Sequence, residues 1–201
     1  MVMQEIFRQA YRSRLIAFDP SDGLKLPKNE KRSHRSITDE ERTHILEVAS
    51  YHPSGLWVLL ILYTGLRPGE AAALQWKDID FDRNEIHVYK AIESGTSTIK
   101  TPKTPAGIRD IPMRKDLRQL LWNVRGDPFS LLFPTRKGTI RSPTSVWKLW
   151  NSFAKELDLH MGAEEQDGKI VHHAIAPDLT LYCLRHTFCT DLQRAGVAIN
   201  I

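Results

Sequence analysis

The stretch that decides the fold is LWVLLILYTGLRPGE, residues 56–70. It opens with the longest apolar run of the chain, eight residues, which is too short for the ~20 residues of a membrane-spanning helix and predicts a buried core helix. Gly65 is typical of a residue that ends a helix, and Pro68 of the first residue of the next helix. Arg67 would then cap that helix, where its guanidinium and the free backbone N–H groups can face one anion. The simpler alternative is an ordinary ion pair between Arg67 and Glu70.

Composition places the chain among ordinary globular proteins. It has 201 residues, of which 41% are hydrophobic and 26% charged, which is enough for one core and a small satellite. A disordered tail, a collagen-like fibre and a disulfide miniprotein are excluded. The N-terminus lacks the pattern of a secretory signal, so we expect a cytoplasmic protein without a membrane segment. Cys183 and Cys189 have neither a zinc nor a disulfide spacing, which favours reduced thiols.

One segment carries the whole excess of positive charge. The chain has 28 lysines and arginines against 24 acidic residues, and outside residues 25–35 the two kinds balance at 23 each. Such a run is often a solvated linker. The alternative is an arm that lies along a polyanion such as DNA. The residues that would then contact DNA are Lys25, Lys28, Lys31, Arg32 and Arg35.

Apolar periodicity predicts a mostly helical α+β domain with a small three-stranded antiparallel sheet. A helix at the start of the chain looks like the end of a preceding domain, residues 1–19, and a basic linker follows at 20–36. A capping box at Thr38 marks the start of the main domain, 37–201. The connection from Leu159 to Pro177 is expected to be polar and without strands. The predicted helices are 4–17, 38–49, 56–64, 68–74, 117–124, 142–157 and 181–196, and the predicted strands 79–81, 85–92 and 108–112.

Two further places can carry chemistry. Arg185 starts on the inward edge of its predicted helix, so it needs an anionic partner; a structural ion pair is the alternative. Lys100 and Lys103 flank a turn between two extended segments, from which a lysine can swing over a neighbouring site. Lysines in such turns usually serve only solubility.

Four motifs, in their order and spacing, resemble the catalytic domain of tyrosine recombinases of the phage-integrase type. The resemblance covers about residues 37–201, and residues 6–28 resemble the last helix of that family's core-binding domain with its linker. The motifs are TGLRPGE (64–70), LQWKDIDF (74–81), KTPKTPAGIRDIP (100–112) and YCLRHTF (182–188).

The resemblance implies a site-specific recombinase that cuts and rejoins DNA through a 3′-phosphotyrosyl intermediate. Bond energy is conserved in such a transfer, so neither ATP nor a metal nor another cofactor is implied. The sequence agrees, because it has no Walker-type glycine loop and no His/Asp/Glu spacing of a metal site. The implied partner is double-stranded DNA, on which the full-length protein would act as a homotetramer.

The resemblance also implies roles for individual residues. Arg67 and Arg185 match the arginine pair that stabilises charge on the phosphate oxygens. Lys103 matches the lysine that protonates the departing 5′ oxygen, with Lys100 as the alternative. Glu70 matches a structural acid. His186 is expected to pack rather than to react.

The sequence departs from the family pattern at two places. Tyr182 stands where the family has a histidine; a phenol can donate to a phosphate oxygen, but with an ordinary pKa near ~10 it is a poor base at pH 7. No tyrosine follows Tyr182, so the family's nucleophile would lie beyond Ile201. These 201 residues alone are therefore expected to be inactive. A catalytically inactive DNA-binding module of the same fold is the main alternative, and an unrelated helical protein with structural arginines is a third.

Overall fold

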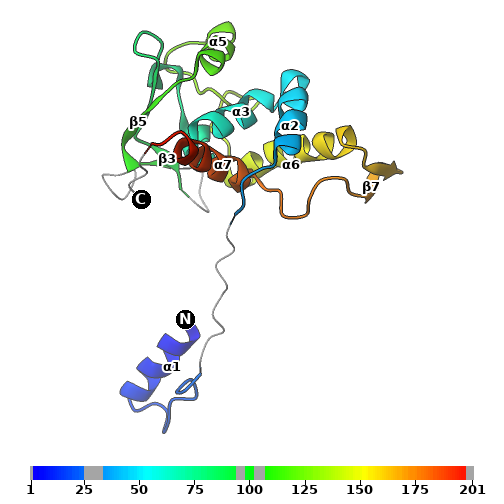
Figure 1. Ribbon diagram of the computed structural model, residues 1–201. Helices are drawn as coiled ribbons and strands as arrows, with labels where there is room; N and C mark the ends of the chain where they lie inside the picture. Colours follow the sequence, from blue (N-terminus) through cyan, green and yellow to red (C-terminus); the bar gives the residue numbers. More distant parts are fainter. Residues whose placement is uncertain (1, 25–33, 94–97, 102–106, 198–201) are drawn as a thin grey trace. The chain divides into compact units, whose positions relative to one another are not determined.

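The structure is a computed structural model of two compact units, Met1–Ser33 and His34–Ile201 (Figure 1). The second unit contains the whole of the predicted main domain. None of the helices in the part of the chain that is described is long and apolar enough to cross a membrane. The structure describes every residue except 1, 25–33, 94–97, 102–106 and 198–201.

The first unit holds one helix, α1 (Val2–Arg12). Its prediction as a helix is confirmed, but the predicted end at residue 17 is wrong. Arg14 adopts a left-handed conformation with φ 59°, and its neighbour Leu15 donates its N–H to the carbonyl of Ala10 at 2.9 Å. The chain therefore leaves the helix after Arg12, because a residue with positive φ cannot continue a right-handed helix.

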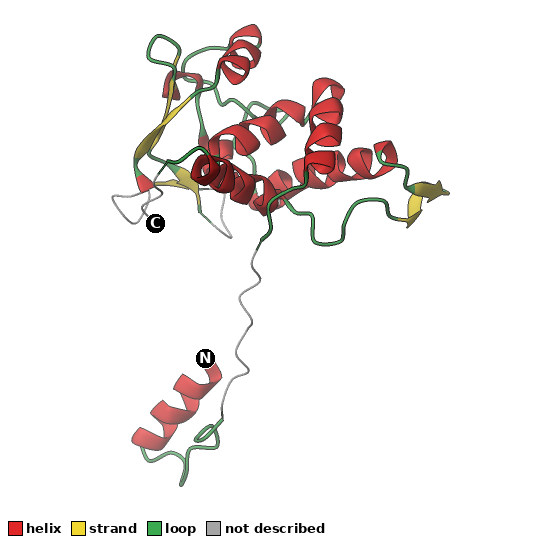
Figure 2. Ribbon diagram, viewed as in Figure 1, coloured by secondary structure: helices red, strands yellow, loops and turns green. Residues whose placement is uncertain are grey.

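The core of the second unit forms around α3 (Gly55–Thr64), the helix predicted from the apolar run. Nearly all of its side chains are buried, as expected of a helix that is apolar on every side. It packs against α2 (Asp39–Tyr51), α5 (Lys115–Asn123) and α7 (Leu181–Arg194). The longest of the described helices, α6 (Pro143–His160), packs against α2 (Figures 1 and 2).

The helices begin and end where local chemistry predicts. Thr38 and Glu41 form the predicted capping box of α2, and Ser142 caps α6 just before Pro143. Gly65 ends α3 in the left-handed conformation with φ 62°. The short helix α4 (Pro68–Ala73) follows almost at once, so the turn between α3 and α4 presents its residues at a defined place on the domain.

The predicted three-stranded antiparallel sheet is confirmed. Its order is β1-β2-β5, formed by β1 (Ile79–Asp80), β2 (Glu85–Val88) and β5 (Arg109–Pro112). A single turn of 3-10 helix, η1 (Trp76–Asp78), leads into β1. Ile86 of β2 stands opposite Ile79 and Ile111 of the two neighbouring strands. It is fully buried, so this face of the sheet completes the core.

Two small hairpins were not predicted. The second predicted strand ends at Val88 instead of Ile92, and β3 (Ala91–Ile92) pairs separately with β4 (Ile99–Lys100). The connection expected to be free of strands contains β6 (Glu164–Gln166) and β7 (Lys169–His172). Asp167 and Gly168 both have positive φ, which is the geometry of a tight two-residue turn between antiparallel strands.

Candidate active site

The turn between α3 and α4 holds Arg67 at the start of α4. Its backbone N–H donates to Glu70 Oε2 at 2.8 Å, and its Nη1 donates to Glu70 Oε1 at 2.9 Å. The ion pair that was the simpler alternative is therefore present. The Arg67 side chain is nevertheless 58% exposed, so most of its guanidinium remains open to a further anion.

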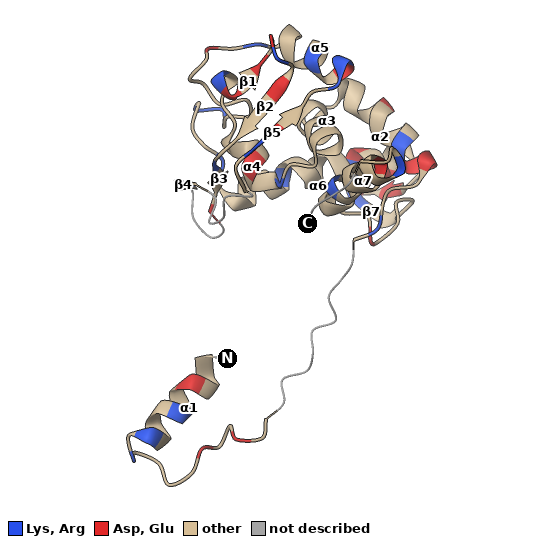
Figure 3. Cartoon of the chain, turned by 60° about the vertical axis from the view of Figure 1, so that its left-hand side comes forward, with Lys and Arg blue, Asp and Glu red and all other residues tan. Residues whose placement is uncertain are grey.

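Glu70 is the buried centre of this cluster, with its side chain 3% exposed. Arg109, at the start of β5, grips it with both terminal nitrogens, at 2.8 Å to Oε2 and 3.2 Å to Oε1. Figure 3 shows the acidic position of α4 close to the basic position of β5. Burial raises the pKa of Glu70, but the hydrogen bonds from Arg109 and Arg67 outweigh it, so the pKa lies below its ordinary value. Glu70 is thus a charged carboxylate that holds two arginines in place.

Arg185 reaches the same place from α7. Its Nη1 donates to the carbonyl oxygen of Gly65, the residue that ends α3. Burial lowers the pKa of Arg185, and the positive charges of Arg67 and Arg109 lower it further while Glu70 raises it. The structure therefore brings Arg67 and Arg185 together, with Arg109 as a third cation around a single carboxylate.

A solvent-open cavity of about 190 Å³ is lined by Arg67. Arg185 interacts electrostatically with Arg67 and Arg109, but Arg109 and Arg185 are not among the lining residues. Arg67 and Glu70 line it on one side, and Trp147 of α6 and Tyr182 of α7 line it on another. The cavity wall holds one guanidinium, that of Arg67, and two carboxylates, those of Glu70 and Glu93. Arg109 and Arg185 nearby bring the guanidinium groups to three. A tetrahedral anion such as a phosphate is the ligand that this combination of forked donors and positive charge suits.

Tyr182 lies at the rim of the cavity on the same helix as Arg185. Its ring stacks on the ring of His34, with centroids 5.1 Å apart and planes at 20°, and Trp147 lies 6.3 Å away. The hydroxyl belongs to a side chain that is 37% exposed. Because it lines the cavity, Tyr182 can contact an anion bound there.

The lysine predictions have different outcomes. Lys103 lies outside the described residues, so its predicted role stays a prediction. Lys100, the alternative, belongs to β4, where its Nζ lies 2.7 Å from Glu93. Since Glu93 also lines the cavity, Lys100 is close to the site but bound to a neighbouring carboxylate.

Of the basic residues expected to contact DNA, only Arg35 is described; Lys25, Lys28, Lys31 and Arg32 lie outside the described residues. Arg35 binds both carboxylate oxygens of Glu41, at 2.6 and 2.7 Å, and donates from Nε to Asp178 at 2.9 Å. The hydrogen bonds from Arg35 lower the pKa of Glu41 although burial opposes them. These contacts favour a structural role for Arg35 in place of the predicted phosphate contact.

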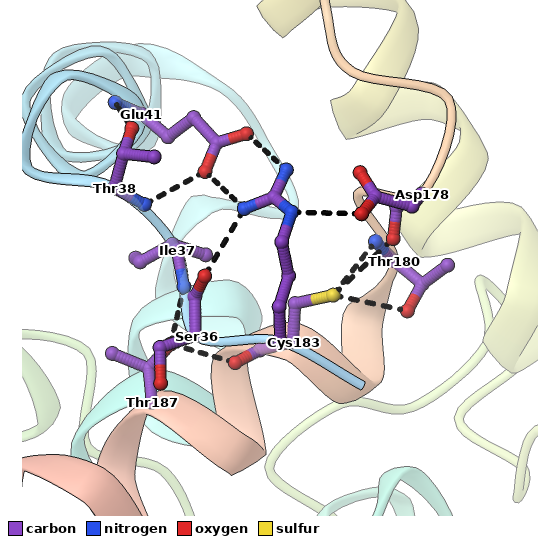
Figure 4. A network of polar contacts seen from close by, with 9 residues as sticks. Ser36, Ile37, Thr38, Glu41, Asp178, Thr180, Cys183 and Thr187 are labelled. Carbon is purple, nitrogen blue, oxygen red and sulfur yellow. Dashed lines mark hydrogen bonds and ion pairs between the residues drawn. The ribbon is translucent and has the colours of Figure 1, made fainter. Parts of the chain in front are cut away.

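The contacts around Arg35 fasten the start of the domain to α7 (Figure 4). Ile37 donates its backbone N–H to Thr187 Oγ1 at 2.9 Å, and Ser36 donates its hydroxyl to Thr190 at 2.8 Å. Further along, Arg42 binds Asp191 at 2.8 Å. We name residues 34–42 the entry segment. The entry segment runs beside α7, the helix that carries Tyr182 and Arg185, and it helps to hold that helix in position.

Arg109 is the site residue that sequence reasoning missed. It stands in the third quoted motif, but nothing in its local pattern distinguishes it from a solvent-facing strand residue. Its partner Glu70 lies 39 positions earlier, and the two meet only because β5 passes beside α4.

Comparison with known proteins matches residues 35–201 to the phage integrase family. A tyrosine recombinase XerC-like protein of Caldanaerobacter subterraneus is 27% identical over 176 residues, which cover 82% of this chain and 45% of the relative. The ICEBs1 integrase of Bacillus subtilis is 34% identical over 127 residues, or 59% of this chain and 33% of the relative. The chain thus spans less than half the length of either relative.

Solved structures share the fold. The Tn1549 transposon integrase, in complex with a circular intermediate DNA, matches with a TM-score of 0.71 and 24% identity, covering 97% of this chain and 65% of that one. A lambda integrase dimer bound to a core site matches with a TM-score of 0.60 and 17% identity, covering 96% and 64%. The likeness extends over nearly the whole of the present chain.

Proposed function

The chain belongs to the phage integrase family, and we propose that it forms most of the catalytic domain of a site-specific DNA recombinase. The observation that carries the proposal is the convergence of Arg185 on Arg67, the arginine that lines an open cavity. Similar structures include two integrases solved with DNA. The substrate is double-stranded DNA, and the reaction joins a DNA phosphate to a protein tyrosine before passing it to a DNA hydroxyl.

In this proposal Arg67 and Arg185 bind the two non-bridging oxygens of the scissile phosphate. Charge grows on those oxygens as the attacking oxygen adds, and fixed donors stabilise that state without having to reorganise. Arg185 enters already desolvated and tied to the Gly65 carbonyl. Glu70 and Arg109 do not touch the phosphate; they are positioning residues that hold Arg67.

The remaining roles follow the family resemblance. Lys103 delivers the proton to the departing 5′ oxygen, and Tyr182 donates a hydrogen bond to a phosphate oxygen from the cavity rim. Lys25, Lys28, Lys31 and Arg32 lie along the DNA backbone. The full-length protein works as a homotetramer on DNA in the cytoplasm, and the chemistry uses neither ATP nor a metal.

The proposal assigns none of these 201 residues to in-line attack on the phosphorus, since no tyrosine follows Tyr182 in the sequence. Stabilising charge without an attacking oxygen leaves the phosphodiester intact. The chain as given should therefore bind DNA and form no covalent adduct. A catalytically inactive DNA-binding module of the same fold has this property too, and a longer chain that includes a nucleophilic tyrosine distinguishes the two by forming an adduct.

The test of the binding site compares arginine variants in a duplex-binding assay over a range of salt. Arg67→Ala and Arg185→Ala should weaken binding and reduce the slope of log affinity against log salt by about one contact each. Arg83→Ala, a change at an exposed arginine whose ion pair is with Glu85 and not with Glu70, is the control. If all three variants bind as the wild type does, the arginine cavity is not a phosphate site.

Two further experiments test the other roles. Deletion of residues 1–33 removes the described α1 and the predicted DNA-contacting lysines but keeps the entry segment, and it should lower affinity and flatten the salt dependence. A nicked suicide substrate tests for covalent attachment on a denaturing gel. An adduct formed by the 201-residue chain and abolished by Tyr182→Phe would overturn the role given to Tyr182.

A further inference from the structure

Three side chains that can bind a metal converge between α2 and α6, away from the arginine cavity. They are His44 and Glu47 of α2 and His160, the last residue of α6, and their ligand atoms all lie within 4.8 Å of one another. His160 Nε2 lies 2.9 Å from Glu47 Oε2, and His44 Nδ1 lies 3.6 Å from the same oxygen. One carboxylate oxygen thus faces two imidazole nitrogens.

The packing of two antiparallel helices produces this arrangement. His44 and Glu47 are three residues apart, so they share one face of α2. Along that face Tyr51 donates its hydroxyl to Glu156 at 3.2 Å, and one turn away Glu47 meets His160. Residue numbers rise on α2 as they fall on α6, so the last residue of α6, His160, meets Glu47 one turn before Tyr51.

His44 Nδ1 is the feature that points to a ligand. It is buried from solvent and has no hydrogen-bond partner among the residues that the structure describes. Its distance of 3.6 Å from Glu47 is too long for a hydrogen bond. A buried polar atom without a partner destabilises the fold, and a cation placed between the imidazole and the carboxylate would satisfy both.

We propose that His44, Glu47 and His160 bind a divalent transition-metal ion, with zinc as the ion that suits them. Zinc binds imidazole nitrogen and carboxylate oxygen at about 2.0–2.2 Å in a tetrahedron, which sets neighbouring ligand atoms about 3.3–3.5 Å apart. The two distances in the structure, 2.9 and 3.6 Å, lie on either side of that value. Calcium and magnesium prefer all-oxygen sites, so two imidazoles select against them.

The site is separate from the proposed recombinase chemistry. Trp147, near the start of α6, lines the arginine cavity, whereas His160 is thirteen positions later at the other end of the same helix. At 1.5 Å per residue the two lie about 20 Å apart along α6. The ion acts as a structural cross-link between α2 and α6 at the point where the chain leaves α6 for the β6–β7 hairpin, and a water completes its coordination.

Zinc binding is measured on the 201-residue chain without a histidine tag. Equilibrium dialysis should find one zinc per chain, cobalt should give the visible absorption of a tetrahedral N/O site, and zinc at about 100 times Kd should raise Tm by about 5–10 °C. His160→Gln and Glu47→Gln should each weaken binding more than the ~10–100-fold caused by loss of an outer-shell partner. His172→Gln is the matched control, because His172 forms an exposed pair with Glu164 at 3.0 Å.

The outcomes separate clearly. Wild-type protein that takes up no zinc and gains no thermal stability overturns the site, and this result needs no variant. A control variant that loses as much binding as His160→Gln shows that zinc binds exposed histidines elsewhere, which also overturns it. Glu47→Gln preserves shape and removes the charge, so it tests the coordination even if His160→Gln fails to fold.

Discussion

Arg109→Ala tests the reasoning that a single buried carboxylate organises the site. The change removes both hydrogen bonds from β5 to Glu70, at 2.8 and 3.2 Å, and leaves a carboxylate that is 3% exposed with only Arg67 as a donor. The fold keeps a buried negative charge that has lost its main counter-ion. The variant should therefore lose much more stability than an ordinary surface arginine variant.

The size of the effect follows from the geometry. A hydrogen bond to a charged group contributes about 1.5–3 kcal/mol, so two of them give a gross loss of roughly 3–6 kcal/mol. Arg109 is 28% exposed, so water replaces part of the lost hydrogen bonding. We therefore expect the free energy of unfolding to fall by about 3 kcal/mol, at the low end for a broken buried ion pair. Arg109→Lys keeps the charge but not the two-pronged grip and should lose about half as much.

Urea unfolding followed by tryptophan fluorescence measures this loss. With a slope of about 2 kcal/mol per molar urea, a loss of 3 kcal/mol lowers the midpoint by ~1.5 M. Arg83→Ala is the control: its side chain is 72% exposed and has one long contact, 3.4 Å from Glu85, so it should cost under about 0.5 kcal/mol. A double-mutant cycle with Glu70→Gln should give a coupling of about 2 kcal/mol.

An Arg109→Ala variant no less stable than Arg83→Ala would show that the buried carboxylate does not depend on Arg109. A cycle without coupling would show that the loss comes from β5 itself and not from the pair with Glu70.

Three other outcomes are expected in the same unfolding assay. Gly65→Ala should lower the free energy of unfolding by about 2–5 kcal/mol, since φ is 62° and the new Cβ would lie 2.4 Å from the Phe188 ring. Gly138→Ala, with positive φ but open space, should cost only the ~1–2 kcal/mol of backbone strain. Equal losses would contradict a steric clash with Phe188. His173→Ala should lower the free energy of unfolding by less than about 1 kcal/mol, because that side chain is 67% exposed. A larger loss would mean that His173 stabilises the fold more than its exposure indicates. Burial raises the pKa of Asp158, but backbone N–H groups and His173 lower it below the ordinary value. The charged carboxylate therefore stabilises the fold above about pH 4, and this contribution is lost as the pH falls through the folded-state pKa. The loss of stability in acid should be shallower in Asp158→Asn, and an unchanged pH profile would show that this carboxylate does not contribute.

Local chemistry made much of the fold predictable. The run of eight apolar residues predicts a fully buried element, and Gly65 at its end favours the helix α3. Gly65 and Pro68 predict the turn that presents Arg67. Gly65 has no Cβ and can adopt positive φ, and Pro68 has no backbone N–H to donate within a helix. The three-stranded sheet follows from β-branched residues bounded by turns.

The rest depends on which elements meet, and a local pattern carries no such information. The pair Glu70–Arg109 spans 39 positions and the pair Glu47–His160 spans 113. The β6–β7 hairpin has mostly exposed residues on both strands, so the apolar alternation that reveals a strand is missing. Its Asp167-Gly168 turn was visible in the sequence, but without that alternation it predicts only a turn.

The entry segment has a mechanical consequence. Its fastenings are spread along α7: His34 on Tyr182, Ile37 on Thr187, and Arg42 on Asp191. A pull on the chain upstream of His34 is therefore delivered to α7 at several points over more than two helical turns. A force distributed in this way displaces α7 as a rigid body and does not unwind it from one end. Arg185 would move with the helix.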